Sequence, residues 1–209
     1  MEKKATLRYI LAFIMMISGW SVMSGGETAT QIATRAAQLL QRASGVRAEF
    51  SLESQGQKLT GTLKSAGSKF AITTPGMSTW YDGKTMWTYN SRVGETTVNT
   101  PTAAEVAETN PMSLISANGS LFTAYYAKKQ PAKGRRIVLM AKGRELGIKS
   151  VAVTIADGTY MPVNIVVTPL KGTPTTVNIK SISTKSNFTV SDFVYPSGKY
   201  PKAEIVDLR

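Results

Sequence analysis

The fold of this chain is decided by one stretch, Trp80-Tyr81-Asp82-Gly83-Lys84-Thr85-Met86-Trp87-Thr88-Tyr89-Asn90. Asp82-Gly83 is a strong hairpin signal between two short segments that carry aromatic side chains. Trp87 and Tyr89 are two residues apart, so they lie on one face of the strand that returns over residues 85–90. The stretch therefore predicts two short antiparallel strands joined by a tight turn.

The period of two continues on both sides of this hairpin. Before it, apolar and polar residues alternate over residues 46–53, with turn residues at Gln55-Gly56. Further strands are expected at residues 58–64, 70–72, 78–81, 95–99, 136–141, 150–156, 163–168 and 175–182. The pattern therefore predicts roughly ten short antiparallel strands, most of them joined by tight turns.

Three helical segments are expected beside these strands. An N-terminal helix over Thr30–Ala43 has apolar residues at helical spacing, and either Thr28 or Thr30 caps it. In the middle of the chain, Thr102–Glu108 opens with a Thr-x-x-Glu capping box. A second short helix is expected over Met112–Ala117, and Asn118-Gly119 should end it.

A sheet of this size must bury its apolar face against another layer. The three helical segments are the cover that the sequence offers. We therefore expect a mainly β, α+β fold: a curved, incomplete antiparallel β-barrel of roughly ten strands, with helices on its concave side. Barrels of this size either pack solid or enclose a ligand cavity.

The first residues have the pattern of a secretory signal peptide. Met1–Arg8 is basic, an apolar run follows over Tyr9–Met23, and residues 24–26 are small. The alternative, a membrane anchor, is disfavoured because the run is shorter than the ~20 apolar residues of a spanning helix. We expect residues 1–24 to be a cleaved signal peptide and residues 25–209 to form a single exported domain.

The composition excludes several classes of enzyme. The chain of 209 residues contains no His and no Cys. A Cys nucleophile, a Ser-His-Asp triad and His or Cys metal ligands are therefore all excluded. Gly83-Lys84-Thr85 superficially matches a phosphate-binding loop, but Ser78 stands where that loop needs Gly, and the tripeptide lies in a hairpin turn. We expect no enzyme, no cofactor and no bound metal.

The net charge of +12 favours an anionic partner: nucleic acid, a phospholipid surface or an acidic protein. The densest basic cluster, beside Tyr125 and Tyr126, comprises Lys128, Lys129, Lys133, Arg135 and Arg136. This cluster is either a solvated loop or a docking site for an acidic membrane or partner. Export argues against nucleic acid.

The aromatic hairpin closely resembles the DGKTLW-x-Y hairpin of LolA, the family of periplasmic carriers of outer-membrane lipoproteins. Other segments agree with that family in the same order. Ser44–Phe50 resembles its Ser-Gly-x-x-Ala-x-Phe strand, and Asn110–Ile115 resembles its lid helix. Asp157-Gly158 resembles a second hairpin, and Phe193–Gly198 resembles the closing segment. The resemblance covers essentially all of Thr28–Arg209.

The resemblance implies a periplasmic carrier that holds the acyl chains of lipoproteins in an apolar concave cavity beneath a short helical lid. An inner-membrane ABC lipoprotein-releasing complex would load this carrier, which would then deliver its cargo to the outer membrane. We expect a monomer. Two alternatives stay open: a LolA-like module that binds another lipid or glycolipid, and a regulator that senses mislocalised lipoproteins.

We expect the acyl chains to contact apolar side chains of the strands and of the lid, although core packing is the simpler interpretation of each aromatic residue alone. From the lid we expect Met112, Leu114 and Ile115. From the strands we expect Phe50, Leu52, Leu63, Phe70, Ile72, Trp80, Trp87 and Tyr89.

The sequence departs from the family at the residues that precede Phe70. The family has an Arg-Pro-x-x-Phe arrangement there, and the Arg helps to hold the lid. This chain has Ala66 and Gly67 at the Arg and Pro positions. Lys64 or Lys69 could take the role of that Arg, although Lys lacks its planar fork.

Overall fold

A computed structural model describes residues 26–116 and 118–209 of the chain. The predicted signal peptide, residues 1–24, lies outside the described residues. None of the described helices combines the length and the apolar character needed to span a bilayer.

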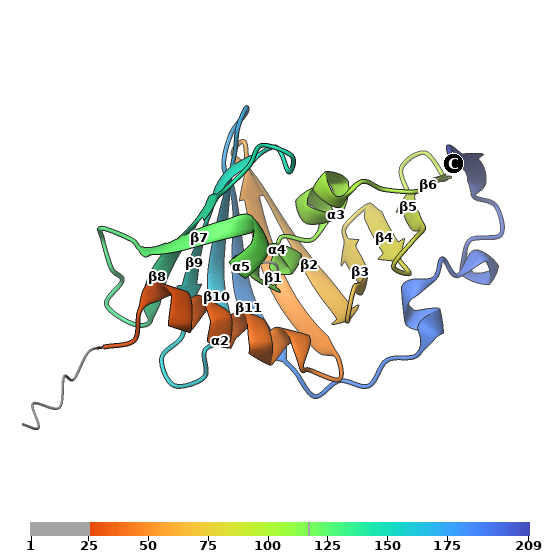
Figure 1. The fold of residues 1–209 in the computed structure, drawn as a ribbon. Helices are drawn as coiled ribbons and strands as arrows, with labels where there is room; N and C mark the ends of the chain where they lie inside the picture. The colour runs from red at the N-terminus through yellow and green to blue at the C-terminus, as the bar shows by residue number, and fades with distance from the viewer. Residues whose placement is uncertain (1–25, 117) are drawn as a thin grey trace, which may run out of the picture.

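The described strands form one curved sheet, with the helices on its concave side (Figure 1). The first six strands are β1 (Val46–Ser54), β2 (Gln57–Ala66), β3 (Lys69–Thr74), β4 (Met77–Tyr81), β5 (Met86–Asn90) and β6 (Glu95–Asn99). The other six are β7 (Phe122–Tyr126), β8 (Arg135–Ala141), β9 (Ile148–Ile155), β10 (Pro162–Pro169), β11 (Thr175–Ser183) and β12 (Glu204–Asp207).

The order along the sheet is β12-β6-β5-β4-β3-β2-β1-β11-β10-β9-β8-β7. Every neighbouring pair is antiparallel except β12 and β6, which are parallel. β12 and β7 form the two edges and do not pair with each other, so the barrel is incomplete. The predicted fold class is confirmed.

All ten predicted strands are present, with bounds within two residues of those expected. The two further strands are the edges, β7 and β12. β7 follows a helix directly, so no turn residues mark its start. β12 has four residues and pairs with β6 far along the chain, and no local turn signals such a pairing.

The N-terminal helix α2 (Ala29–Gln41) starts at the predicted cap. Thr28 and Gln31 form a reciprocal capping box: the Gln31 amide donates to Thr28 Oγ1 at 3.2 Å, and the Thr28 amide donates to Gln31 Oε1 at 2.8 Å. Ile32 and Ala36 lie on one face of the helix and are fully buried. The helix ends two residues before the predicted end, Ala43.

Three short helices form the segment between β6 and β7, which we call the lid. They are α3 (Ala103–Thr109), α4 (Met112–Ser116) and α5 (Asn118–Leu121). The predicted capping box of α3 is confirmed, because the Glu105 amide donates to Thr102 Oγ1 at 3.2 Å. α4 ends at Ser116, and the predicted last residue of this helix, Ala117, lies outside the described residues. Asn118-Gly119 begins a further helix, α5, which the sequence did not predict and which leads directly into β7. The pair marks a boundary between two helices instead of the end of the helical segment.

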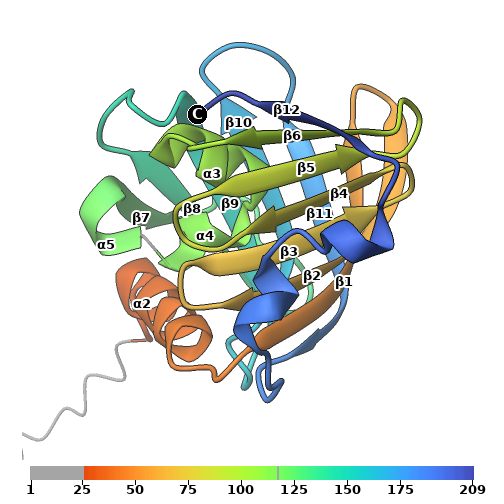
Figure 2. The ribbon, with the colours of Figure 1, turned by 90° about the vertical axis from the view of Figure 1, so that its right-hand side faces the viewer.

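The sheet carries an apolar cluster on each face. The larger cluster fills the concave side and joins α2 and the lid to strands on both halves of the sheet. The smaller cluster lies on the outer face around Trp80 and Phe193. There the segment after β11, with 3-10 helices η1 (Val190–Phe193) and η2 (Ser197–Lys199), crosses the outer face near β3 and β4 (Figure 2).

Ring contacts and one ion pair hold this C-terminal segment against the sheet. The Trp80 ring centroid lies 5.6 Å from that of Tyr195, and the centroids of Tyr89 and Tyr200 lie 4.2 Å apart. Lys64 Nζ donates to Asp192 Oδ1 at 2.8 Å. This hydrogen bond is the main cause that lowers the pKa of the Asp192 carboxyl. The segment is therefore a structural part of the domain.

Replacing Phe193 by Ala should lower the free energy of unfolding by about 3–5 kcal/mol, because it empties the centre of the outer cluster. Phe193 is 2% exposed. Urea denaturation followed by tryptophan fluorescence measures the change. Val190→Ala, in the same 3-10 helix but 65% exposed, is the control and should stay within about 0.5 kcal/mol of the wild type. Equal losses of unfolding free energy in the two variants would show that Phe193 does not anchor the C-terminal segment to the sheet.

Candidate binding cavity

A half-open cavity of about 640 Å³ lies between the lid and one end of the sheet. The end of α2 at Leu40 and the β2–β3 turn at Ala66–Ser68 form two of its borders. Tyr81 at the end of β4 and Val106 of α3 form the others. The volume is within the range of about 300–1,000 Å³ that small-molecule sites occupy.

The lining of this cavity is mostly apolar. Its polar side chains are neutral: Gln41, Ser65, Ser68, Asn110 and Ser113. Its larger apolar side chains include Leu40, Val46, Val106, Met112, Leu114 and Leu146. Among the described residues, the lining contains no Asp, Glu, Lys or Arg. Such a surface favours an apolar chain with a neutral polar end and disfavours an unpaired charge.

Five of the predicted strand residues belong to the concave side. Phe50, Leu63 and Phe70 are buried in the larger cluster, and Leu52 and Ile72 pack against it. In the described structure the cavity lining includes none of these five. They form the floor on which α2 and the lid pack, and contact between them and a ligand stays a prediction.

The structure corrects the predicted lining at three positions: Trp80, Trp87 and Tyr89 lie on the outer face. The physical reason is the register of two hairpins. The tight turn after β3 pairs Phe70 with Tyr81, and so it places Trp80 on the opposite face from Phe70. Trp87 pairs with Trp80, and Tyr89 follows Trp87 at the strand period of two. Tyr81 is the aromatic residue of this hairpin that reaches the cavity.

The three predicted lid residues all face the concave side. Met112 and Leu114 line the cavity, and their side chains are 9% and 2% exposed. Ile115 is 1% exposed and lies in the core. α4 packs against α2. The lid therefore fills part of the concave face with its own apolar side chains.

The β2–β3 turn brings no cation to the lid in this chain. Gly67 has a φ of +59°, which suits Gly in this turn and leaves no side chain to reach the lid. Lys64 is bonded to Asp192 on the outer face. Lys69 precedes the inward-facing Phe70 in β3, so it also lies on the outer face. Neither predicted substitute for the family's Arg reaches the lid.

A different cation contacts the lid. Lys142 Nζ, in the loop after β8, donates to the backbone oxygen of Gly119 in α5 at 3.0 Å. The Lys142 amide also donates to the Leu121 oxygen at 2.9 Å. This contact of Lys142 could not be predicted from the sequence, because no local pattern connects a loop lysine to a helix 23 residues earlier.

Replacing Lys142 by Met should loosen the lid, because the side-chain hydrogen bond to Gly119 is lost. We expect amide hydrogen exchange in α4 and α5 to accelerate by about two- to tenfold, which corresponds to the net worth of one hydrogen bond. Hydrogen exchange followed by mass spectrometry measures this change. Lys149→Met changes another exposed lysine, in β9, and should leave lid exchange unaltered. Equal exchange in all three proteins would contradict a role of Lys142 in holding the lid.

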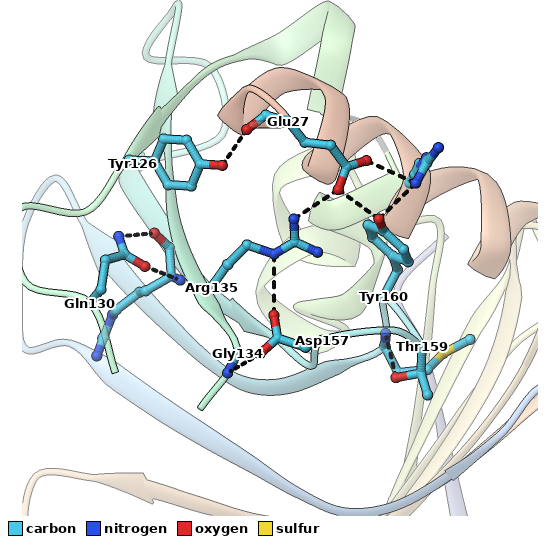
Figure 3. Close-up of polar contacts among 11 residues, drawn as sticks. Glu27, Tyr126, Gln130, Gly134, Arg135, Asp157, Thr159 and Tyr160 are labelled. Atoms are coloured by element: carbon cyan, nitrogen blue, oxygen red, sulfur yellow. Dashed lines mark hydrogen bonds and ion pairs between the residues drawn. The ribbon is translucent and has the colours of Figure 1, made fainter. Parts of the chain in front are cut away.

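A polar network lies at the other end of α2 and centres on Glu27 (Figure 3). One carboxylate oxygen of Glu27 pairs with Arg35 Nη1 at 2.8 Å. The other pairs with Arg135 Nη1 at 2.8 Å and accepts a hydrogen bond from Tyr160 Oη at 2.6 Å. Tyr126 Oη donates to the Glu27 backbone oxygen. The network therefore ties the start of α2 to β7, β8 and the β9–β10 loop.

The network has a second carboxylate. Arg135 Nε lies 3.3 Å from Asp157 Oδ1, and Asp157 Oδ2 accepts from the Gly134 amide at 2.9 Å. The guanidinium carbon atoms of Arg35 and Arg135 lie 5.0 and 5.2 Å from the Tyr160 ring centroid. From their neighbours in the sequence, Arg135 is expected in a basic loop and Asp157 in a turn, and no spacing pattern connects either residue to Glu27.

Hydrogen bonds from Tyr160 and then Arg135 lower the pKa of the Glu27 carboxyl. A lowered pKa in the folded state adds stability that is fully present above the unfolded value of about 4.3 and is lost as the pH falls through the folded value. In Glu27→Gln the free energy of unfolding should therefore fall less steeply than in the wild type as the pH drops below about 4.3, because the Gln side chain does not titrate. Thermal denaturation across the acidic range measures this.

Glu108→Gln on α3 makes the same change of charge away from the network, and it should keep the wild-type pH profile. A Glu27→Gln profile parallel to that of the wild type throughout the acidic range would contradict the proposed linkage.

A family model described as "Outer membrane lipoprotein carrier protein LolA" matches residues 21–169. These residues comprise α2, the lid and the sheet from β1 to β10. The match therefore includes the elements that bound the cavity. No curated protein sequence matches the chain.

Several solved structures are similar to this chain. An uncharacterised conserved protein from Thermus thermophilus is similar with a TM-score of 0.58 and 14% identity, over 86% of this chain and 98% of that one. A putative outer membrane lipoprotein-sorting protein domain from Vibrio parahaemolyticus has a TM-score of 0.48 and 10% identity, over 79% and 95% of the two chains. A LolA superfamily protein from Nitrosomonas europaea has a TM-score of 0.43 and 9% identity, over 81% and 99%. The first of these likenesses shows the fold alone.

Proposed function

Because the chain belongs to the outer membrane lipoprotein carrier family LolA, we propose that it binds the acyl chains of lipoproteins in the cavity beneath its lid. In this proposal the protein works in the periplasm. An inner-membrane ABC lipoprotein-releasing complex loads it, and it carries its cargo to the outer membrane. The protein acts by binding and release, without a chemical reaction.

The cavity is the observation that carries this proposal. An acyl chain gains about 0.8 kcal/mol for each CH₂ that leaves water, so an apolar lining without charged side chains supports binding of such a chain. The neutral polar groups of the lining, such as Ser65 and Ser68, suit the ester and glycerol groups that join acyl chains to a lipoprotein. The cavity is half-open, so the protein part of the cargo would remain in solvent.

The lid supplies a means of release. Met112, Leu114 and Ile115 are buried on the concave face, where cargo would bind. An acyl chain that displaces them replaces apolar contacts that the protein already makes. The free energy of cargo binding is therefore the difference between the apolar contacts that the cargo makes and those of the lid that it displaces. This difference keeps binding reversible. The Lys142 bond adds a small further preference for the closed lid.

Replacing Val106 by Glu should abolish cargo release, because it puts an unpaired charge into the apolar lining. Val106 is half-buried, so the fold should tolerate this change, whereas Phe70 is 1% exposed and a charge there would test folding. The protein purified from the periplasm is added to spheroplasts, and the supernatant is assayed for acylated lipoproteins. We expect ATP-dependent release by the wild type, and at least about tenfold weaker binding of a fluorescent fatty acid by the variant.

Val93→Glu is the matched control, because it makes the same substitution at a 69% exposed site between β5 and β6. It should release lipoproteins like the wild type. Fatty-acid binding without lipoprotein release would show that the cavity serves another lipid, the alternative cargo. Loss of neither activity in Val106→Glu would place the binding site elsewhere and overturn the proposal.

A further inference from the structure

The outer face of the sheet changes character near its β7 edge. Along β8, Ile137 and Leu139 point to the concave core and are 0% and 1% exposed. The alternate residues Arg136, Val138 and Met140 therefore lie on the outer face. Figure 1 shows β7 and β8 at one end of the sheet, far along it from the strands that the C-terminal segment crosses.

Exposed apolar side chains gather on this outer face. Tyr125 of β7 pairs with Val138 of β8, so both lie on the same face, and Tyr125 is 54% exposed. Met140, one strand period from Val138, is 36% exposed. We call this surface the edge patch. It comprises Tyr125, Val138 and Met140, with Arg136 beside them on β8 and Lys128, Lys129 and Lys133 in the adjoining β7–β8 loop. Apolar groups on an exposed face of this kind are typical of an interaction surface.

The segment of the chain that carries the edge patch is rich in basic residues. Residues 122–149 contain eight basic residues and one acidic residue, whereas the whole chain has a net charge of +12. Two of the eight are engaged: Arg135 pairs with Glu27 and Asp157, and Lys142 binds the lid. The other six form no ion pair with a described carboxylate, and they are Lys128, Lys129, Lys133, Arg136, Arg144 and Lys149.

We propose that the edge patch docks the protein onto the surface of an anionic phospholipid bilayer. Uncompensated cations attract anionic headgroups, and Tyr125 can place its ring among them with its hydroxyl in water. Four of the six unpaired cations are Lys, which act as point charges and suit a diffuse layer of phosphates. Recognition of carboxylates on an acidic protein would favour the planar fork of Arg. Docking would bring the protein to the membrane without occupying the cavity.

The test is co-sedimentation of the protein, purified from the periplasm, with vesicles of equal parts phosphatidylglycerol and phosphatidylcholine. Vesicles of phosphatidylcholine alone are the lipid control. The patch variant carries three Lys→Glu changes in the β7–β8 loop, at Lys128, Lys129 and Lys133. The control variant makes the same charge change on other exposed surfaces, at Lys58, Lys84 and Lys202.

The wild type should bind the anionic vesicles and leave the neutral ones, and added salt should weaken its binding. The patch variant should bind at least about tenfold more weakly, whereas the control variant should lose much less. Tyr125→Ser should weaken binding a few-fold while salt still has its effect. Circular dichroism checks that each variant is folded.

Three outcomes would overturn the proposal. Equal losses in the two triple variants would show that net charge alone drives binding. Equal binding to neutral vesicles would show that lipid is taken up by an apolar site. No binding of the wild type to anionic vesicles would leave an acidic protein as the partner of the patch. The Val106→Glu variant should bind vesicles like the wild type, so failure of the cavity proposal and failure of this one are distinguishable.

Discussion

The structure depends on the need to cover the apolar concave face of a curved sheet. α2 and the lid provide that cover, and Leu114 and Ile115 of α4 are almost completely buried in it. The contacts that α2 and the lid make with the sheet therefore stabilise the fold, and they also compete with an apolar ligand. If the helices filled the concave side completely, no space would remain for a ligand. If they left it uncovered, a large apolar surface would be exposed to water. The cavity beneath the lid is the space that remains between these two limits.

α2 and the lid are held in place by different interactions. This difference makes α2 the fixed part of the cover and the lid its movable part. Glu27 ties the start of α2 to Arg135 and Tyr160, and the buried face of the helix packs against the core. The lid has apolar contacts and hydrogen bonds from the side chain and the amide of Lys142. Non-directional apolar contacts can be exchanged for those of an acyl chain, whereas a network of charge-assisted hydrogen bonds loses its partners when it opens. Cargo of the kind proposed would therefore displace the lid and leave α2 in place.

The outer face has a role of its own. Trp80 packs there with Phe193, and the C-terminal segment crosses the strands that follow β2. This second cluster stabilises the half of the sheet on which the cavity opens. It accounts for the aromatic residues of the hairpin, which would otherwise suggest a ligand site. No described segment covers the other end of the outer face, where Tyr125 is exposed and the neighbouring cations form no ion pair with a described carboxylate.

Local patterns in the sequence were enough to predict the ten inner strands, a helix cap at Thr28 or Thr30, the capping box at Thr102, and the family. Alternation, turn residues and caps act over a few residues, so a single stretch of chain expresses them. The tertiary structure decided which face each aromatic residue occupies, because hairpin register sets the face and a shift of one residue reverses it. It also decided the edge strands, the Lys142 bond to the lid and the Glu27 network, whose Tyr160 partner is 133 residues away. Such contacts have no local signal, because they form when the curved sheet brings distant segments together.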